Sequence, residues 1–344
     1  MKEVFLTGIT CTGEPHIGNY VGAIKPGIDV SYDSSKQSFF FVADLHALIK
    51  CQSPEVVYAS SLSITCAWLA LGLNKDNAVF YKQSDVPEIS ELCWILNCVA
   101  AKGLMNRAHA YKAAIEKNNL NNNDPDYAVS MGLYSYPVLM AADILMFRAN
   151  QVPVGKDQIQ HVEMARDIAA RFNHIYGELL TLPEAYIDAK TPVLNGLDGR
   201  KMSKSYNNTI PIFLEEKQLR KAINKIKTNL QEPGEPKDPD VSTVFQIWQA
   251  FAAKEQILEM REKFKNGIGW GDAKKELFEL INNRLKEPRE KYKELLSNPS
   301  EIEEFLQEGS NKARAISIPL LHEIKQAIGI KDPRNFELKL KGYV

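Results

Sequence analysis

The sequence has few cysteines and no paired-cysteine motif. Its five cysteines, at positions 11, 51, 66, 93 and 98, form an odd set without a Cys-X-X-Cys spacing. Such a spacing is typical of structural zinc and iron–sulfur sites, so its absence argues against them, and we expect no metal-ligating residues. The pattern favours free thiols in a reducing compartment.

The sequence also lacks a strong net charge, a long apolar run and a leader-like start. Its 42 Lys and Arg nearly balance 43 Asp and Glu, giving a net charge of -1, so contact with a nucleic acid would need a local basic face. No window approaches the length of a membrane span, and the opening residues MKEVFLTG contain no apolar core of a signal peptide. We therefore expect a cytoplasmic protein with no membrane association.

Apolar runs alternate with helical stretches in the first half of the chain. The runs at 4–6, 38–42 and 78–82 predict strands, and the stretch from Pro54 to Leu71 predicts a helix between two of them. Further on, we expect helices at 136–147 and 158–172 around a short strand at 152–154. This alternation predicts an α/β fold with a parallel sheet, whose ligands bind at the carboxyl ends of the strands.

A glycine-punctuated loop follows the first predicted strand. Residues 7–20 read TGITCTGEPHIGNY, with glycines at 8, 13 and 18. The first turn of a helix carries unpaired N–H groups and partial positive charge, and glycines let a phosphate approach the main chain. His16 stands at this turn, where an imidazole can donate to phosphate oxygens; the alternative is a surface loop histidine.

A second loop, at 199–205, reads GRKMSKS. Lys201 and Lys204 carry two positive charges on a loop that begins with glycine, which suits a triphosphate, although a charge pair is ordinarily a solvated feature. Two such motifs in this order are far more specific than either alone. The hydroxyls of Ser203 and Ser205 commonly satisfy their own turn in such loops.

The two motifs resemble the HIGH and KMSKS motifs of the class I aminoacyl-tRNA synthetases. Asn19 departs from the fourth HIGH position but keeps a hydrogen-bond donor. Four further stretches are similar to the tryptophanyl-tRNA synthetases in particular: GNYVGA at 18–23, ADLHAL at 43–48, SYPVLMAADIL at 135–145 and VPVGKDQIQH at 152–161. The similarity thins beyond Tyr206 to a helical pattern.

The resemblance implies a Rossmann-type parallel-sheet catalytic domain followed by a mainly α-helical C-terminal domain. The catalytic domain would span residues 1–208, with a helical dimerisation insertion at about 87–130 and the lysine loop at 199–205. Residues 209–344 would form a helical anticodon-binding domain, whose last helix packs back on the catalytic domain. Pro319 predicts that this helix kinks or begins again.

The implied activity is that of a tryptophan–tRNA ligase. L-tryptophan would react with ATP, assisted by Mg²⁺, to give tryptophanyl-adenylate and pyrophosphate, and tryptophan would then pass to the 3′ end of tRNA(Trp). The enzyme would be a homodimer.

The resemblance also assigns residues to roles. The catalytic residues would be His16, Asn19, Lys201 and Lys204. The ATP-binding residues would be Thr10, Thr12, Gly18, Asn19, Gly155, Asp157, Val193, Lys201, Met202, Ser203 and Lys204. The tryptophan-binding residues would be Leu6, Gly8, His46, Tyr136, Met140, Asp143, Val154 and Gln158.

Amino-acid identity is expected to depend on Asp143. It lies in the apolar stretch LMAADILMF, where a carboxylate needs a partner. In the tryptophan family the matching aspartate accepts the indole N–H; the alternative is a structural Asp that pairs with a buried Arg or caps a neighbour. Met140 lies one turn earlier on the same face and serves core packing equally well. Leu6 stands where many family members have an aromatic residue, and Asp157 has the alternative role of a helix cap.

Three other functions were weighed against the tryptophan enzyme. A tyrosyl-tRNA synthetase shares the fold and motifs, but the stretches LMAADI and VPVGKDQ favour the tryptophan version. A non-catalytic paralogue that senses tryptophan or binds RNA often loses His16 or the lysines, which are present here. A small-molecule nucleotidyltransferase is disfavoured by the helical tail and the complete lysine motif.

Overall fold

A computed structural model describes residues 3–155, 158–186 and 194–330, and its centre is a parallel sheet. The strand order is β3-β2-β1-β4-β5, with every pairing parallel. The chain therefore crosses over between β3 and β4, so that β4 returns beside β1 and creates a topological switch point there. The strands are β1 (Glu3–Thr10), β2 (Lys36–Ala43), β3 (Ala78–Lys82), β4 (Gln151–Pro153) and β5 (Glu184–Tyr186).

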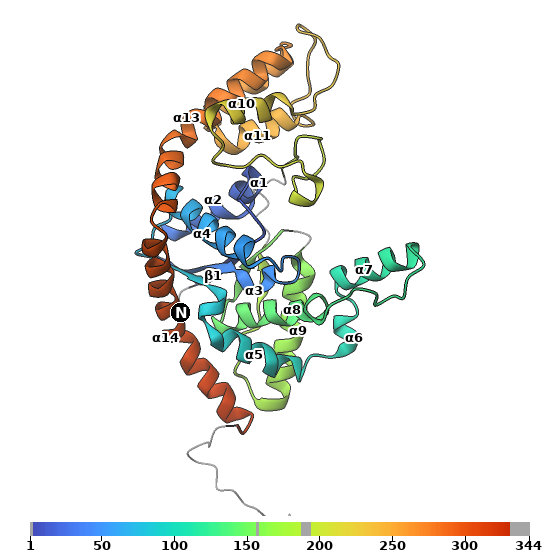
Figure 1. Ribbon diagram of the computed structural model, residues 1–344, viewed down its shortest axis with the longest axis vertical. Coiled ribbons are helices and arrows are strands. Elements are labelled where there is room, and N and C mark those ends of the chain that lie inside the picture. The colour runs from blue at the N-terminus through green and yellow to red at the C-terminus, as the bar shows by residue number, and fades with distance from the viewer. Residues whose placement is uncertain (1–2, 156–157, 187–193, 331–344) are drawn as a thin grey trace, which may run out of the picture.

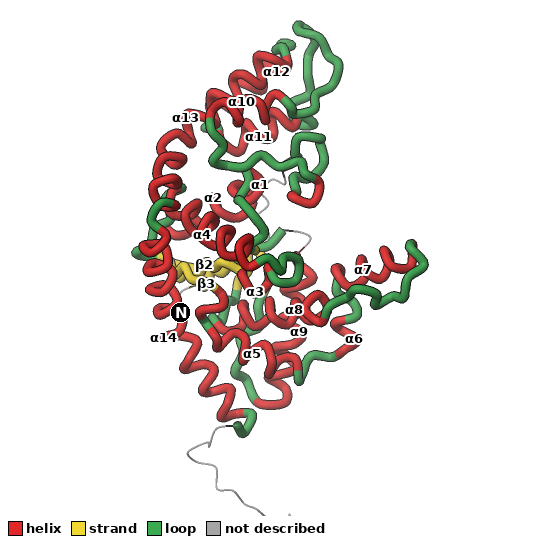
Figure 2. The backbone as a smooth tube through the Cα atoms, viewed as in Figure 1, coloured by secondary structure: helices red, strands yellow, loops and turns green. Residues whose placement is uncertain are grey.

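The predicted strands are confirmed, and β5 is an addition that the sequence patterns did not indicate. β2 is buried on both faces, as its run of apolar residues predicts: Phe39 stacks on Phe147 at 4.6 Å and Phe40 packs against Trp68 at 4.8 Å between ring centroids. Helices cover both faces of the sheet (Figure 2). The predicted parallel α/β fold is therefore confirmed.

The helix after the first loop is continuous but irregular, passing from α1 through the π-helical turn η1 into α2. Helix α8 begins at Met131 rather than at Tyr136, because the Ser130 hydroxyl accepts the Leu133 N–H at 3.1 Å and caps an earlier turn. The helices of this part are α1 (Ile17–Asn19), η1 (Tyr20–Ile24), α2 (Lys25–Ser31), α3 (Asp44–Ala47), α4 (Pro54–Ala70), η2 (Gln83–Asp85), α8 (Met131–Met146) and α9 (Ile159–Tyr176).

The region predicted as an insertion contains three separate helices. They are α5 (Pro87–Asn97), α6 (Lys102–Met105) and α7 (His109–Leu120), and α7 projects away from the sheet in Figure 1. Large apolar side chains are exposed here, among them Trp94 at 72% and Leu120 at 85%.

After the lysine loop, which contains the short 3₁₀ turn η4 (Lys204–Tyr206), the regular structure of the described chain is helical. The helices of this part are α10 (Glu216–Asn224), α11 (Thr243–Phe251), α12 (Lys254–Lys265), α13 (Trp270–Leu296) and α14 (Pro299–Ala327). The core shared by α10 to α13 also contains Ile17 and Val21 from the start of the first helix, and Met202 from the lysine loop. The helical part therefore packs directly against both sequence motifs.

The long helices α13 and α14 run down one side of the molecule and bring the chain back to the sheet (Figure 1). Gly309 of α14 lies so close to β3 that an added Cβ would come within 1.7 Å of the Phe80 carbonyl oxygen. Arg314 donates to the buried Glu88 carboxylate at 2.9 Å, which pins α14 to α5. Helix α14 thus covers the β3 edge of the sheet, and it continues through Pro319 rather than beginning again there. In the described ranges, no helix is both long enough and apolar enough to cross a membrane.

Candidate active site

His16 caps the helix that begins at the first motif. Its Nδ1 accepts the Asn19 backbone N–H at 3.3 Å, and the Asn19 side-chain oxygen accepts the His16 N–H at 3.1 Å. This reciprocal capping box satisfies two donors of the helix start. Gly18 fits against the imidazole, because a Cβ there would lie 3.0 Å from two ring atoms. The histidine ring is therefore fixed in orientation by its own turn.

Backbone hydrogen bonds join the first motif to the segment that follows the lysine loop. The Ile17 N–H donates to the Ile210 carbonyl at 2.9 Å, and the Ile212 N–H donates to the Pro15 carbonyl at 3.1 Å. These two bonds flank an antiparallel bridge between His16 and Pro211. The two motifs, far apart in the sequence, are thus held side by side.

Lys204 reaches across this junction to the glycine loop. Its Nζ donates to the carbonyl of Gly13 at 2.9 Å and to that of Thr12 at 3.2 Å. The loop is itself anchored, because the Gly13 N–H donates to the Ser60 hydroxyl at 2.8 Å. Gly13 has a φ of +107°, a backbone conformation that favours glycine. The site therefore contains an ammonium group beside the main chain that leads to His16.

Burial and this ammonium group set the protonation of His16. Burial, followed by the charge of Lys204, lowers the pKa of His16 from 6.5 to about 4. Burial also lowers the pKa of Lys204, whose nitrogen sits against carbonyls although much of its side chain is exposed. At neutral pH His16 is uncharged, and because Nδ1 accepts a bond its proton lies on Nε2, where it can serve as a donor.

The rest of the lysine motif divides between surface and core. Lys201 is exposed, whereas Met202 is 6% exposed and packs in the core of the helical part. The Ser203 hydroxyl accepts the Ser205 N–H at 3.3 Å, which is the local turn expected for such serines. Nucleotide contacts by Lys201, Met202 and Ser203 stay predictions.

Asp143 is buried at the carboxyl edge of the sheet, with 1% of its surface exposed. His46 Nε2 lies 2.9 Å from Oδ2, and the Gln83 amide donates to both oxygens at 2.8 and 3.0 Å. Burial raises the pKa of Asp143 above its ordinary value, while the bonds from His46 and Gln83 act in the opposite direction. The partner that a buried carboxylate requires is therefore His46 with Gln83, and neither an Arg nor a helix cap.

A chain of polar contacts links three elements beside this carboxylate. The Tyr136 hydroxyl lies 2.6 Å from His161 Nε2, and His161 Nδ1 donates to the Gln158 side-chain oxygen at 2.8 Å. Because Nδ1 is the donor, Nε2 of a neutral ring accepts the Tyr136 O–H. Tyr136 also meets the His46 ring edge-on, at 6.4 Å between ring centroids. Four of the predicted tryptophan-binding residues, namely His46, Tyr136, Asp143 and Gln158, are thus brought together.

Three apolar members of the predicted pocket come from β1, which holds Leu6 and Gly8, and from α8, which holds Met140. Leu6 is 3% exposed and packs in the core that contains Phe41, on the face of β1 opposite to Phe5. Gly8 pairs with Phe41 across the sheet, and a Cβ at Gly8 would come within 2.4 Å of that ring. The glycine is therefore required by the phenylalanine beside it. Met140 is half-buried, one turn before Asp143.

The remaining predicted residues lie at strand ends or outside the described chain. Thr10 ends β1 and is exposed, and Val154 follows β4 with its N–H bonded to the Tyr186 carbonyl at 3.0 Å. Gly155 accepts the Gln158 N–H at 2.8 Å, at the start of α9. Asp157 and Val193 lie outside the described residues.

Three residues in or beside the site were missed by sequence reasoning: Gln83, His161 and Asn208. Gln83 follows β3 directly, so the rule that ligands meet at carboxyl ends of parallel strands could have identified it. His161 ends the VPVGKDQIQH stretch but has no pattern of its own. Asn208 is buried under the lysine loop, where asparagine is usually just a turn residue.

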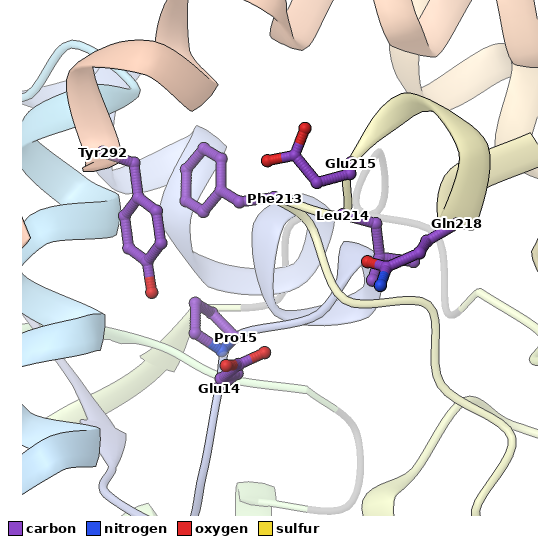
Figure 3. Close-up of a pocket in the computed structure, with 7 residues that line it drawn as sticks. All are labelled: Glu14, Pro15, Phe213, Leu214, Glu215, Gln218 and Tyr292. Atoms are coloured by element: carbon purple, nitrogen blue, oxygen red, sulfur yellow. The ribbon is translucent and has the colours of Figure 1, made fainter. Parts of the chain in front are cut away.

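A small hollow of about 170 Å³ is lined in part by Glu14 and Pro15 of the first motif (Figure 3). Phe213 and Tyr292 stack beside it at 4.1 Å between ring centroids. Glu14 and Glu215 border the hollow, and their carboxylates repel a triphosphate. The hollow is therefore poorly suited to a triphosphate.

No group of three or more His, Cys, Asp or Glu side chains in the described part of the chain could hold a metal ion. Mg²⁺ that accompanies a nucleotide is usually bound through substrate phosphates and water, with few protein ligands. The residues present fit that manner of binding. All five cysteines are free thiols, as predicted.

Comparison with known proteins agrees with the geometry. Residues 2–286 match the family described as tRNA synthetases class I (W and Y). A tryptophan–tRNA ligase of Neisseria meningitidis is 55% identical over 96% of this chain and 98% of its own length, and one of Pseudomonas putida is 55% identical over 97% and 75%. The crystal structure of tryptophanyl-tRNA synthetase from Campylobacter jejuni complexed with ADP and tryptophan is similar with a TM-score of 0.83. That chain is 45% identical, with 95% of this chain and 99% of that one covered. The chain belongs to the class I aminoacyl-tRNA synthetases, among the tryptophanyl-tRNA synthetases.

Proposed function

We propose that this chain activates L-tryptophan with ATP and then transfers tryptophan to the 3′ end of tRNA(Trp). The observation that carries the proposal is the junction of the two motifs, where Lys204 contacts the loop before His16. The buried Asp143 lies at the carboxyl edge of the same sheet. One nucleotide and one amino acid can meet at such an edge.

In the activation step, a carboxylate oxygen of tryptophan attacks the α-phosphorus of ATP. A new P–O bond forms, the bond to the β-phosphate oxygen breaks, and pyrophosphate leaves with the electron pair. Both reactants are anionic, so the protein has to hold them in line and neutralise charge on the leaving group. Lys201 and Lys204 supply positive charge, and neutral His16 offers its Nε2–H as a hydrogen-bond donor to a phosphate oxygen. Mg²⁺ bound with the nucleotide would supply further positive charge to its phosphates.

Selection of tryptophan rests on Asp143 as a buried acceptor. His46 and Gln83 fix the carboxylate in place, and a carboxylate has lone pairs left for an indole N–H. Phenylalanine has no N–H to donate to this acceptor, so it gains no such hydrogen bond in the pocket, whereas the indole N–H of tryptophan is satisfied there. The pocket wall at Leu6 is aliphatic where many relatives have an aromatic residue, so the indole packs on an alkyl side chain there. Tyr136 and Gln158 would hold the α-amino group.

The rest of the molecule serves the same reaction. Residues 1–208 form the catalytic domain and residues 209–344 the anticodon-binding domain, which positions tRNA(Trp). The insertion at about 87–130 supplies the homodimer interface, consistent with its exposed Trp94 and Leu120. Because ATP, tryptophan and tRNA meet in the cytoplasm, we place the enzyme there.

The test is amino-acid-dependent exchange of pyrophosphate into ATP, followed by charging of bulk tRNA. We expect exchange with tryptophan and charging with labelled tryptophan. Exchange with tyrosine alone would show a tyrosyl enzyme, and tryptophan binding without exchange would show a non-catalytic paralogue. Lys204→Ala is expected to lower kcat for exchange more than tryptophan affinity, because its partner charge develops in the transition state.

A further inference from the structure

Asn208 lies directly after the lysine loop and is almost completely buried, with 2% of its surface exposed. Its side-chain oxygen accepts the Ser203 N–H at 2.8 Å. Its amide nitrogen donates to the Asp198 carboxylate at 2.7 Å and lies 3.3 and 3.2 Å from the carbonyls of Arg200 and Lys201. One side chain therefore holds the main chain on both sides of Lys201.

The backbone of Asn208 also holds the lysine loop. Its carbonyl accepts the Leu197 N–H at 2.9 Å, so both ends of the loop are tied to one residue. Gly196 makes room for it, since a Cβ there would lie 2.4 Å from the Asn208 side chain. The bond from Asn208 is also the first cause of the lowered pKa of Asp198, about 2, which keeps that partner ionised.

Lys201 and Lys204 depend on this arrangement for their direction. Lys204 begins the short turn η4, and Ser203, which Asn208 holds, is the residue that caps it. A loop with two cationic side chains repels itself and has no apolar core of its own except Met202. Without a fixed main chain the lysines would sample many orientations, and their charge would no longer be preorganised for the leaving pyrophosphate.

We propose that Asn208 is a positioning residue that orients Lys201 and Lys204 for the transition state of adenylate formation. This inference rests on the proposed function of these lysines. Asn208 acts through the lysine loop and not on the substrate, because its side chain is buried beneath the loop and its polar atoms are all used in hydrogen bonds to the loop.

The first experiment compares Asn208→Ala with wild type in tryptophan-dependent ATP–pyrophosphate exchange. We expect kcat to fall about 30-fold, while the KM for tryptophan stays within about twofold, because preorganised charge acts in the transition state. An unchanged kcat, or an equal change in both constants, would overturn the inference.

Asn173 supplies a matched control. It is also a buried asparagine that holds a loop, with bonds to Glu178, Leu179 and Leu180 at the end of α9. Asn173→Ala removes the same number of side-chain atoms and is expected to lower Tm comparably without a selective fall in kcat. A selective kcat loss in Asn173→Ala as well would reduce the effect at Asn208 to general destabilisation.

A double-mutant cycle tests the route of action. In a Lys204→Ala background, Asn208→Ala is expected to lower kcat by less than about fivefold, because the Lys204 ammonium that Asn208 positions is already missing. If the loss of kcat in the double variant equals the product of the two single losses, Asn208 acts independently of Lys204, which would contradict the proposed route.

Exchanging donor and acceptor gives a rescue. Asn208→Asp alone faces Asp198 with a second carboxylate and is expected to be worse than Asn208→Ala. Adding Asp198→Asn restores the donor–acceptor pair between positions 198 and 208, while the contacts with the carbonyls of Arg200 and Lys201 stay lost, and should recover about tenfold in kcat over Asn208→Asp; no recovery counts against the proposal. Wild-type enzyme without any exchange would instead refute the proposed function, so the two failures are distinguishable.

Discussion

Burial and the charge of Lys204 lower the pKa of His16, so that its side chain is uncharged at neutral pH. The unfolded chain takes up a proton near pH 6.5, whereas the folded chain takes it up only near pH 4. Between these values the unfolded state binds more protons, so the free energy of unfolding falls as the pH is lowered.

This linkage gives a prediction for His16→Asn, which keeps a good helix cap but removes the titrating group. From pH 6.5 to 4.5, wild type should lose up to about 1.4 kcal/mol per pH unit more stability than the variant. Denaturant unfolding across this range measures the difference. Equal acid sensitivity of the two proteins would mean that His16 is not held neutral.

Asp143→Ala should relax discrimination among aromatic amino acids. Without this acceptor the indole N–H of tryptophan loses its hydrogen-bond partner, whereas phenylalanine loses no such bond, so the ratio of kcat/KM for tryptophan over phenylalanine should fall at least about tenfold.

Met140→Leu is the control for this change, since it keeps the volume on the same helix face and should hold the ratio within about threefold. A large loss in Met140→Leu, or an unchanged ratio in Asp143→Ala, would place selection elsewhere in the pocket.

Among single residues, the sequence motifs predicted several residues that the structure brings together. They did not predict the residues that hold these side chains and loops in place. His16, Lys204 and Asp143 stand in stretches whose chemistry is visible from neighbouring residues. Gln83 and Asn208 act through bonds to residues distant in sequence or to main-chain atoms. Such contacts arise only when strands and loops are placed in space, so no local pattern marks them.

Among the helices and strands, the contact between Gly309 of α14 and Phe80 of β3 can be tested by adding a single methyl group at Gly309. Gly309→Ala would place a Cβ 1.7 Å from the Phe80 carbonyl oxygen, so the helix must move off the edge of β3. We expect a loss of about 2 kcal/mol or more in the free energy of unfolding, seen as a lower Tm.

Gly271→Ala in α13 is the matched control, since a Cβ there meets nothing within 4 Å. Alanine is the better helix former, so the change should stabilise by about 0.5 to 1 kcal/mol. A harmless Gly309→Ala would show that α14 is not seated tightly against the sheet.

The predicted elements were right where periodicity or a buried run was strong, as in β2, β3 and α9. β5 was missed because three residues, Glu184–Tyr186, carry no strand pattern and gain their pairing from β4 alone. Of the two outcomes predicted at Pro319, a kink or a new start, α14 does not begin again there, because its packing on the sheet and on α5 outweighs one lost hydrogen bond.

For the whole molecule, the exposed apolar side chains of the insertion predict a dimer. Trp94 is 72% exposed on α5, and aromatic residues of this kind are enriched at interface centres. Trp94→Glu should shift the protein from dimer to monomer in analytical ultracentrifugation.

Leu258→Glu on α12, where the leucine is 65% exposed, should leave the assembly unchanged. A monomeric wild type, or a Trp94→Glu protein that stays dimeric, would contradict this use of the insertion.

We propose that the two motifs close on one nucleotide beside a pocket whose buried acid receives an indole. A crystal structure with tryptophan and a non-hydrolysable ATP analogue tests this arrangement directly. We expect triphosphate oxygens within hydrogen-bond distance of both His16 Nε2 and Lys204 Nζ, and the indole N–H on Asp143. A triphosphate bound away from this junction, or an indole that does not meet Asp143, would contradict it.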